Sequence, residues 1–245
     1  MDGRDPLERD AAGIGALADP VRRRLYRFVC AQPAPVSRDQ AADALGIPHH
    51  QAKFHLDRLT AEGLLETDYA RLTGRSGPGA GRTAKLYRRA RHDIAISLPQ
   101  REYELAGRLM ADAIAQSAAT GEPVVEVLDR VARDYGRAIG APQRPPADAA
   151  GALRLALAVL REHGYEPRRA SGEVQLANCP FHALAQQQRE LACHMNHALI
   201  TGVAEALAPH GPEARLCPGP DRCCVVLRPG PNRRASAPRP RTSAR

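Results

Sequence analysis

The sequence predicts a mainly α protein with small β elements, divided into an N-terminal domain of short helices, a helical middle segment and a small α+β domain that bears cysteines. Three observations predict this organisation. Residues 19–63 contain three short helical patterns separated by proline and glycine. Two longer amphipathic patterns follow Pro99, and five of the six cysteines lie beyond Gly172 among short alternating stretches.

The three short helices have clear start and stop signals. Asp19-Pro20 places an N-cap before a proline at the first helical position, and apolar residues recur at helical spacing to about Cys30. The segment from Ser37 to Gln40 is typical of a capping box, and Gly46 ends that helix. A third helix is expected over residues 49–63. Two helices joined by a tight glycine-containing turn form a helix-turn-helix unit.

Two strands around a basic loop are expected after the third helix. Leu64–Thr67 and Lys85–Arg88 are the strands, and residues 71–91 contain seven basic side chains and no acidic one. Such a hairpin makes a wing. The sequence therefore predicts a winged helix-turn-helix DNA-binding domain over residues 1–92.

The third helix is expected to enter the major groove of double-stranded DNA, which is about 12 Å wide. Its base-facing candidates are His49, His50, Gln51, Lys53 and Phe54. The groups expected to meet phosphates are Arg58, Arg75, Arg82 and Lys85, and Ser37 and Gln40 complete the predicted DNA-binding set. An alternative is a scaffold protein whose winged helix contacts another protein.

Three segments resemble the ArsR-type winged-helix regulators. They are Leu17-Ala-Asp-Pro-Val-Arg-Arg-Arg-Leu25, His55-Leu-Asp-Arg-Leu-Thr-Ala-Glu-Gly-Leu-Leu65 and Gly81-Arg-Thr-Ala-Lys-Leu-Tyr87, within a stretch that covers about a third of the chain. The last is similar to the Gly-Arg-Pro-Ala-Lys-Leu-Tyr pattern of the SufR-like branch, with Thr83 in place of proline. The resemblance implies a transcriptional regulator, active as a repressor or an activator.

Residues 93–146 are predicted to be a helical linker and dimerisation region, with helices over 101–117 and 123–139. A dimer is expected because regulators of this sort read two half-sites with two-fold symmetry. Residues 147–229 are the predicted α+β sensor domain, and residues 230–245 a disordered basic tail.

The spacing of the cysteines constrains any shared site. Cys193 is expected to lie off the apolar stripe of its helix, about 160° from the leucine and methionine two residues to either side. One straight helix over residues 182–193 would span about 16 Å, too far for Cys179 and Cys193 to ligate one small metal centre. Shared ligation therefore predicts a break at Gln188-Arg189, with Cys193 in the first turn of the second helix.

Several thiols in one small domain indicate a soft-metal or iron–sulfur site. The predicted ligands are Cys179, His182, Cys193, Cys223 and Cys224. The resemblance to SufR-like regulators implies an iron–sulfur cluster whose state changes DNA affinity. Here the spacing of the later cysteines departs from the cyanobacterial pattern, which leaves the third and fourth ligands open. Zinc, a thiol-redox switch and an oxidisable or arsenic-binding vicinal dithiol at Cys223-Cys224 are alternatives.

Composition sets the remaining expectations. The formal net charge of +8 favours a polyanionic partner, although the excess of arginine over the two lysines resembles a proteome-wide bias. The absence of a long apolar run or a secretory signal predicts a cytoplasmic protein, in which thiols stay reduced. An enzyme with a nucleophilic cysteine and His182 or His197 as base is an alternative. No phosphate loop, serine elbow or carboxylate pair supports catalysis, so we expect no enzyme.

Overall fold

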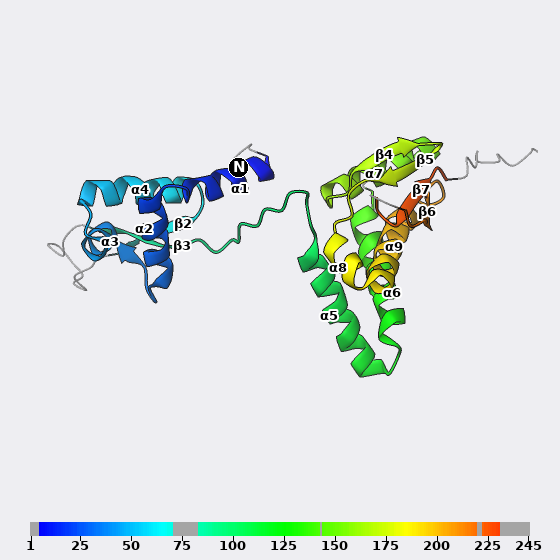
Figure 1. Cartoon of the computed structure of the whole chain (residues 1–245), viewed down its shortest axis with the longest axis horizontal. Helices are drawn as coiled ribbons and strands as arrows, with labels where there is room; N and C mark the ends of the chain where they lie inside the picture. The colour runs from blue at the N-terminus through cyan, green and yellow to red at the C-terminus, as the bar shows by residue number, and fades with distance from the viewer. Residues whose placement is uncertain (1–4, 71–82, 143, 220–221, 231–245) are drawn as a thin grey trace, which may run out of the picture. The chain divides into compact units, whose positions relative to one another are not determined.

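The computed structural model describes residues 5–70, 83–142, 144–219 and 222–230, and Figure 1 shows its elements. The chain divides into two compact units, Met1–Ile96 and Ser97–Arg245, called here the N-terminal unit and the C-terminal unit. The helices of residues 93–146, which the sequence analysis assigned to a separate region, are part of the C-terminal unit.

The N-terminal unit consists of short helices and a small antiparallel sheet. Its elements are α1 (Pro6–Ala16), α2 (Pro20–Ala31), β1 (Val36–Ser37), α3 (Arg38–Leu45), α4 (His49–Ala61), β2 (Leu65–Ala70) and β3 (Ala84–Arg89). The strand order is β1-β3-β2. The sequence analysis missed α1 and β1, whereas the three predicted helices and the two wing strands are confirmed. The wing loop itself lies outside the described residues.

Local signals in the sequence fix the helix ends of this unit. The Asp19 carboxylate accepts hydrogen bonds from the backbone N–H groups of Val21 and Arg22, at 2.8 and 2.9 Å. Ser37 and Gln40 form the predicted capping box, and Gly46 ends α3 in the left-handed conformation at φ 64°. The core beneath contains the fully buried side chains Leu25, Leu56 and Leu59 together with Tyr87.

The C-terminal unit packs five helices with a four-stranded antiparallel sheet among its described residues. Its elements are α5 (Tyr103–Thr120), α6 (Val124–Gly140), α7 (Ala149–Glu162), β4 (Pro167–Ala170), β5 (Glu173–Leu176), α8 (His182–Gln187), α9 (Arg189–Glu205), β6 (Glu213–Leu216) and β7 (Val225–Arg228). The strand order is β4-β5-β7-β6. This arrangement confirms the predicted mainly α fold class with small β elements. Within the described part of the chain, no helix is long and apolar enough to cross a membrane.

Two glycines allow α6 and α9 to touch through their backbones. A Cβ added at Gly136 would lie 2.0 Å from the carbonyl oxygen of Leu199, and one added at Gly202 would lie 2.0 Å from that of Arg133. Both distances are far shorter than real carbon–oxygen contacts, so only glycine fits at these positions. This contact fixes the position of α9 against α6.

The predicted helix break is present. Gln188 leaves helical geometry at φ −131° and ψ 66°, and it separates α8 from α9. No proline or glycine marks this position, so a helix-breaking residue does not account for the break. Because α9 starts at Arg189, Cys193 is its fifth residue, one position beyond the predicted first turn.

Candidate functional site

Helix α4 has one buried and one exposed face. Ala52, Leu56 and Leu59 are fully buried in the domain core. On the opposite side Lys53 and Phe54 are exposed, and the Phe54 side chain keeps 65% of its surface accessible. His50 is exposed and Gln51 is half-buried, so this face offers cationic, aromatic and amide groups at one surface.

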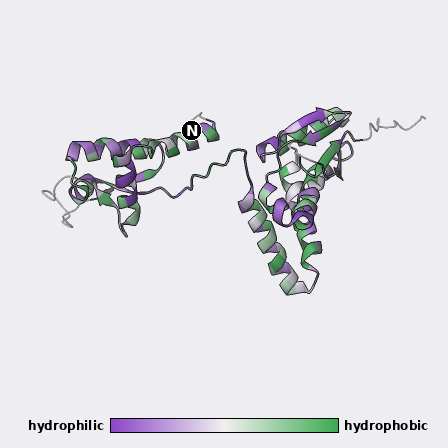
Figure 2. Cartoon of the chain, in the orientation of Figure 1, coloured by the Kyte–Doolittle hydropathy of each residue, from purple (hydrophilic) through white to green (hydrophobic). Residues whose placement is uncertain are grey.

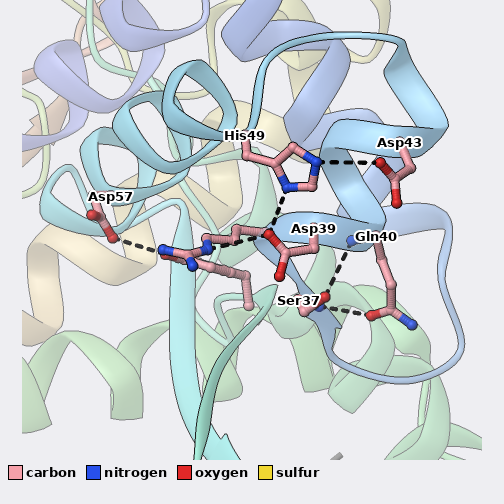
Figure 3. Close-up of polar contacts among 8 residues, drawn as sticks. Ser37, Asp39, Gln40, Asp43, His49 and Asp57 are labelled. Carbon is pink, nitrogen blue, oxygen red and sulfur yellow. Dashed lines mark hydrogen bonds and ion pairs between the residues drawn. The ribbon is translucent and has the colours of Figure 1, made fainter.

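His49 lies between two carboxylates of α3, as Figure 3 shows. Its Nδ1 is 2.7 Å from the Asp39 carboxylate and its Nε2 is 3.5 Å from that of Asp43. The hydrogen bond from His49 is the main reason that the pKa of Asp39 lies below its usual value. His49 therefore ties the start of α4 to α3, and a base contact by its ring would have to replace these carboxylates.

Ser37 and Gln40 are used in the start of α3. The Ser37 hydroxyl accepts from the Gln40 N–H at 3.1 Å, and the Gln40 side-chain oxygen accepts from the Ser37 N–H at 2.8 Å (Figure 3). Ser37 is also buried. These interactions satisfy backbone groups that a helix start would otherwise leave unpaired, so both residues have a role in the fold, and a DNA contact by either stays a prediction.

The remaining predicted phosphate contacts differ in their surroundings. The Lys85 ammonium and the Tyr87 hydroxyl donate to the Asp57 carboxylate at 2.7 and 2.9 Å. Burial raises the pKa of Asp57, but these two hydrogen bonds outweigh it and the net shift is downward. Arg58 pairs with Glu62 at 2.6 Å. Arg75 and Arg82 lie outside the described residues.

Comparison with known families agrees with this arrangement. Residues 17–68 match a family model described as a helix-turn-helix domain. The N-terminal unit contains a helix-turn-helix domain. The match runs from just before α2 into β2, and it supports a DNA-binding transcription regulator. No curated protein matches the chain.

The C-terminal unit, which follows the helix-turn-helix domain in the sequence, contains a pocket of about 730 Å³ that is lined by thiols. All five predicted ligands contribute to its wall: Cys179, His182, Cys193, Cys223 and Cys224. They come from three separate segments, namely the stretch after β5 with the start of α8, the second turn of α9, and the two residues before β7. Cys217 is exposed and does not line the pocket.

Neighbouring pocket thiols shift one another's pKa: Cys193 acts on Cys224, Cys224 on Cys223, and Cys223 on Cys179. The hydrogen bond from Cys223 lowers the pKa of Cys179 despite the burial of that thiol. Donation to Cys179 raises the pKa of Cys223 to about 12, and burial raises the pKa of Cys193 to about 12. Among these four pocket thiols, Cys179 is therefore the one that ionises most readily.

Buried polar groups support the thiols from behind. Asn196 is fully buried, and its side-chain amide donates to the Cys223 sulfur at 3.1 Å while its carbonyl accepts from the Tyr165 hydroxyl. The sequence analysis missed Asn196. Its position among the buried residues Met195 and Leu199 of α9 was an available signal, because an amide on an apolar helix face needs a buried partner.

The thiols and the histidine that line the pocket suit a soft metal. Their arrangement distinguishes a single zinc ion from an iron–sulfur cluster. Among the described residues, no three His, Cys, Asp or Glu side chains gather closely enough to hold a single metal ion. A zinc ion at about 2.3 Å from each thiolate needs its sulfur ligands only about 3.8 Å apart. An iron–sulfur cluster takes thiolates on different iron atoms, so it accepts a wider set around a pocket. Arg189 and Arg222 also line this pocket and favour thiolates.

The two histidines considered as catalytic bases contact other groups. The His182 ring is 3.0 Å from the Gln186 amide nitrogen, and the His197 ring is 3.2 Å from the carbonyl oxygen of Ala214. His197 therefore joins α9 to β6, and the described contacts pair neither ring with a thiol.

Proposed function

We propose that this protein is a dimeric DNA-binding transcription regulator of the ArsR type, close to the SufR-like branch, whose DNA affinity depends on an iron–sulfur cluster. The observation that carries the proposal is the convergence of four cysteines from three chain segments on one pocket, in a chain that also contains a helix-turn-helix domain. The pocket residues account for ligand binding, and the exposed face of α4 accounts for DNA recognition.

The proposed ligands are Cys179, Cys193, Cys223 and Cys224. An iron–sulfur cluster supplies a redox-active, oxidation-sensitive group that is held by thiolates. The protein contributes a thiol of lowered pKa at Cys179, an amide hydrogen bond to the Cys223 sulfur, and two arginines, Arg189 and Arg222, that favour the anionic form of the site. His182, at the same pocket, is the alternative ligand in a zinc centre.

The dimer is proposed to form through the α5–α6 hairpin. Ile114 on α5 keeps 61% of its surface exposed, and Val124 and Val125 at the start of α6 keep 41% and 49%. Figure 2 colours much of both helices as hydrophobic. A second copy of the chain would cover this surface and provide the second helix-turn-helix domain that a two-fold symmetric operator requires.

Two lysine substitutions test the DNA interface. Lys53→Ala should relax the preference at one base pair, because an amine contact to a base edge is worth about 1–3 kcal/mol of discrimination. Lys85→Ala should weaken binding to all sequences and lower the slope of log affinity against log salt by about one or less, since Asp57 already neutralises part of its charge. Binding to duplexes selected from a random-sequence library, measured over a salt series, provides both quantities.

Arg168→Ala is the matched control for these variants, because Arg168 is an exposed cation on β4 of the C-terminal unit. It should change neither the base preference nor the salt slope. If Lys53→Ala and Lys85→Ala behave like this control, neither residue contacts DNA.

Anaerobic purification of the full chain tests the sensor. We expect broad visible absorption, iron and sulfide in the same sample, the mass of a dimer, and a change in affinity for the selected duplex after the cluster is removed. A colourless protein with stoichiometric zinc would replace the cluster by a zinc site, and one without metal would leave a thiol switch. A monomer at the concentration used for DNA binding would contradict the proposed dimer.

A further inference from the structure

The stretch that carries Cys179 is hydrogen bonded to the segment at which the peptide chain enters the C-terminal unit. One Arg101 guanidinium nitrogen donates to the carbonyl oxygen of Cys179 at 2.6 Å and to the side-chain oxygen of Asn178 at 2.9 Å. In the other direction, the Asn178 amide donates to the carbonyl oxygen of Gln100 at 3.1 Å. The Glu102 N–H also donates to the carbonyl oxygen of Pro180 at 3.2 Å.

Burial of Asn178 and partial burial of Arg101 shelter these hydrogen bonds, so water competes little for their donors and acceptors. Asn178 is buried, and its amide also donates to the carbonyl oxygen of Gly164 at 2.6 Å. Arg101 is half-buried and contributes to the wall of the thiol pocket. A guanidinium donating to oxygens at these distances forms charge-assisted hydrogen bonds, the strong kind. Residues 100–102 and 178–180 are therefore joined as one unit.

The connection matters because of the position of Arg101 in the sequence, close to the end of the N-terminal unit. The chain leaves the helix-turn-helix domain of the N-terminal unit at Ile96, and Arg101 follows five residues later. The acceptor of the Arg101 hydrogen bond is the backbone carbonyl oxygen of Cys179 itself, a residue that lines the pocket. Any rearrangement of Cys179 on ligand binding thus reaches a guanidinium a few residues from the DNA-binding unit.

We propose that Arg101 is a positioning residue that couples occupancy of the thiol pocket to DNA affinity. The inference rests on the proposed function, since it names the route by which the bound group regulates DNA binding. Ligation of the group by Cys179 changes the Arg101 hydrogen bond to its carbonyl oxygen, and this change alters how the segment that joins the two units is anchored. A ligand shifts an equilibrium only through contacts that differ between two states, and the Arg101–Cys179 contact is such a contact.

The test compares Arg101→Gln and Arg101→Lys with the wild-type chain, with Arg108→Gln as the matched control. Arg108 is an exposed arginine on α5, and among the described residues it has no hydrogen bond or ion pair. Each protein is measured for iron, sulfide and visible absorption. Its affinity for the duplex selected with the wild type is then measured with and without the bound group, and amide hydrogen exchange is followed over residues 90–101.

In the wild type we expect the two affinities to differ by about 5–150-fold, the usual range of allosteric coupling. In Arg101→Gln the iron content should be unchanged and the two affinities should agree within about twofold, with equal exchange over residues 90–101 in both states. Arg101→Lys keeps one charged donor and should retain part of the difference. Arg108→Gln should match the wild type.

Two outcomes would overturn the role of Arg101. One is a wild-type affinity difference that persists in Arg101→Gln. The other is loss of the bound iron in Arg101→Gln and Arg101→Lys alike, which would make Arg101 a structural part of the pocket. If the wild type itself binds DNA equally well in both states, the proposed regulation by the pocket fails, whatever Arg101 does.

Discussion

Replacing Cys223 by serine is expected to abolish the visible absorption of the proposed iron–sulfur cluster and to remove its iron and sulfide. Cys223 is the middle thiol of the pocket, since it interacts with Cys179 and Cys224 and accepts a hydrogen bond from Asn196. Loss of a group that hydrogen bonds to a metal ligand typically costs about 10–100-fold in metal affinity. Removal of a ligand should cost more, because a serine oxygen is a poor substitute for a soft thiolate.

Cys217→Ser is the matched control for this substitution. Cys217 is exposed, lies outside the pocket wall, and accepts a hydrogen bond from Arg222 at 3.3 Å. It should keep full absorption and iron content. If Cys223→Ser and Cys217→Ser lose iron equally, or if neither does, the ligand set centred on Cys223 is incorrect. Metal analysis and absorption of proteins purified without oxygen provide the comparison.

Gly136→Ala is expected to destabilise the C-terminal unit by about 2–3 kcal/mol. The added methyl group would overlap the carbonyl oxygen of Leu199, so α6 and α9 would have to separate, and overpacking of this kind costs about 1–3 kcal/mol or more. The overlap is with backbone, which a side-chain rotation cannot relieve. Urea unfolding of the full chain, followed by circular dichroism, measures the change.

Gly107→Ala provides the contrasting case on α5. An added Cβ there meets nothing within 4 Å, so the helix propensity of alanine should stabilise the chain by up to about 1 kcal/mol. Equal changes in the free energy of unfolding for the two substitutions would contradict the close backbone contact between α6 and α9. A fall in iron content with Gly136→Ala would further link this contact to the thiol pocket.

The sequence predicted those features that depend on neighbouring residues. The Asp19 cap, the Ser37–Gln40 capping box and the turn at Gly46 are local hydrogen-bonding and conformational signals, and all three are confirmed. The break at Gln188 was predicted from chemistry, because two distant cysteines on one straight helix could not share a centre. The short strands β1 and β4 were missed, since β1 has only two residues and β4, Pro-Arg-Arg-Ala, has no alternation of apolar and polar residues.

Contacts between distant segments could not be read from the chain. Arg101 and Cys179 are 78 residues apart, and no local pattern connects them. The same holds for Tyr165 and Asn196, which meet behind the thiols. The shared location of four predicted cysteines was a hypothesis from residue type, and the order of their interactions required the folded backbone.

The glycine contact between α6 and α9 determines which walls of the pocket can adjust. Because Gly136 and Gly202 bring the two backbones together, α9 cannot slide along α6 without a clash, and Cys193 is carried on this fixed helix. Adjustment to an incoming group therefore falls to the stretches that carry Cys179 and the Cys223–Cys224 pair. In the proposed site, Cys193 would therefore stay in place on α9, and the stretch that would adjust around Cys179 is the one that Arg101 holds through its hydrogen bonds.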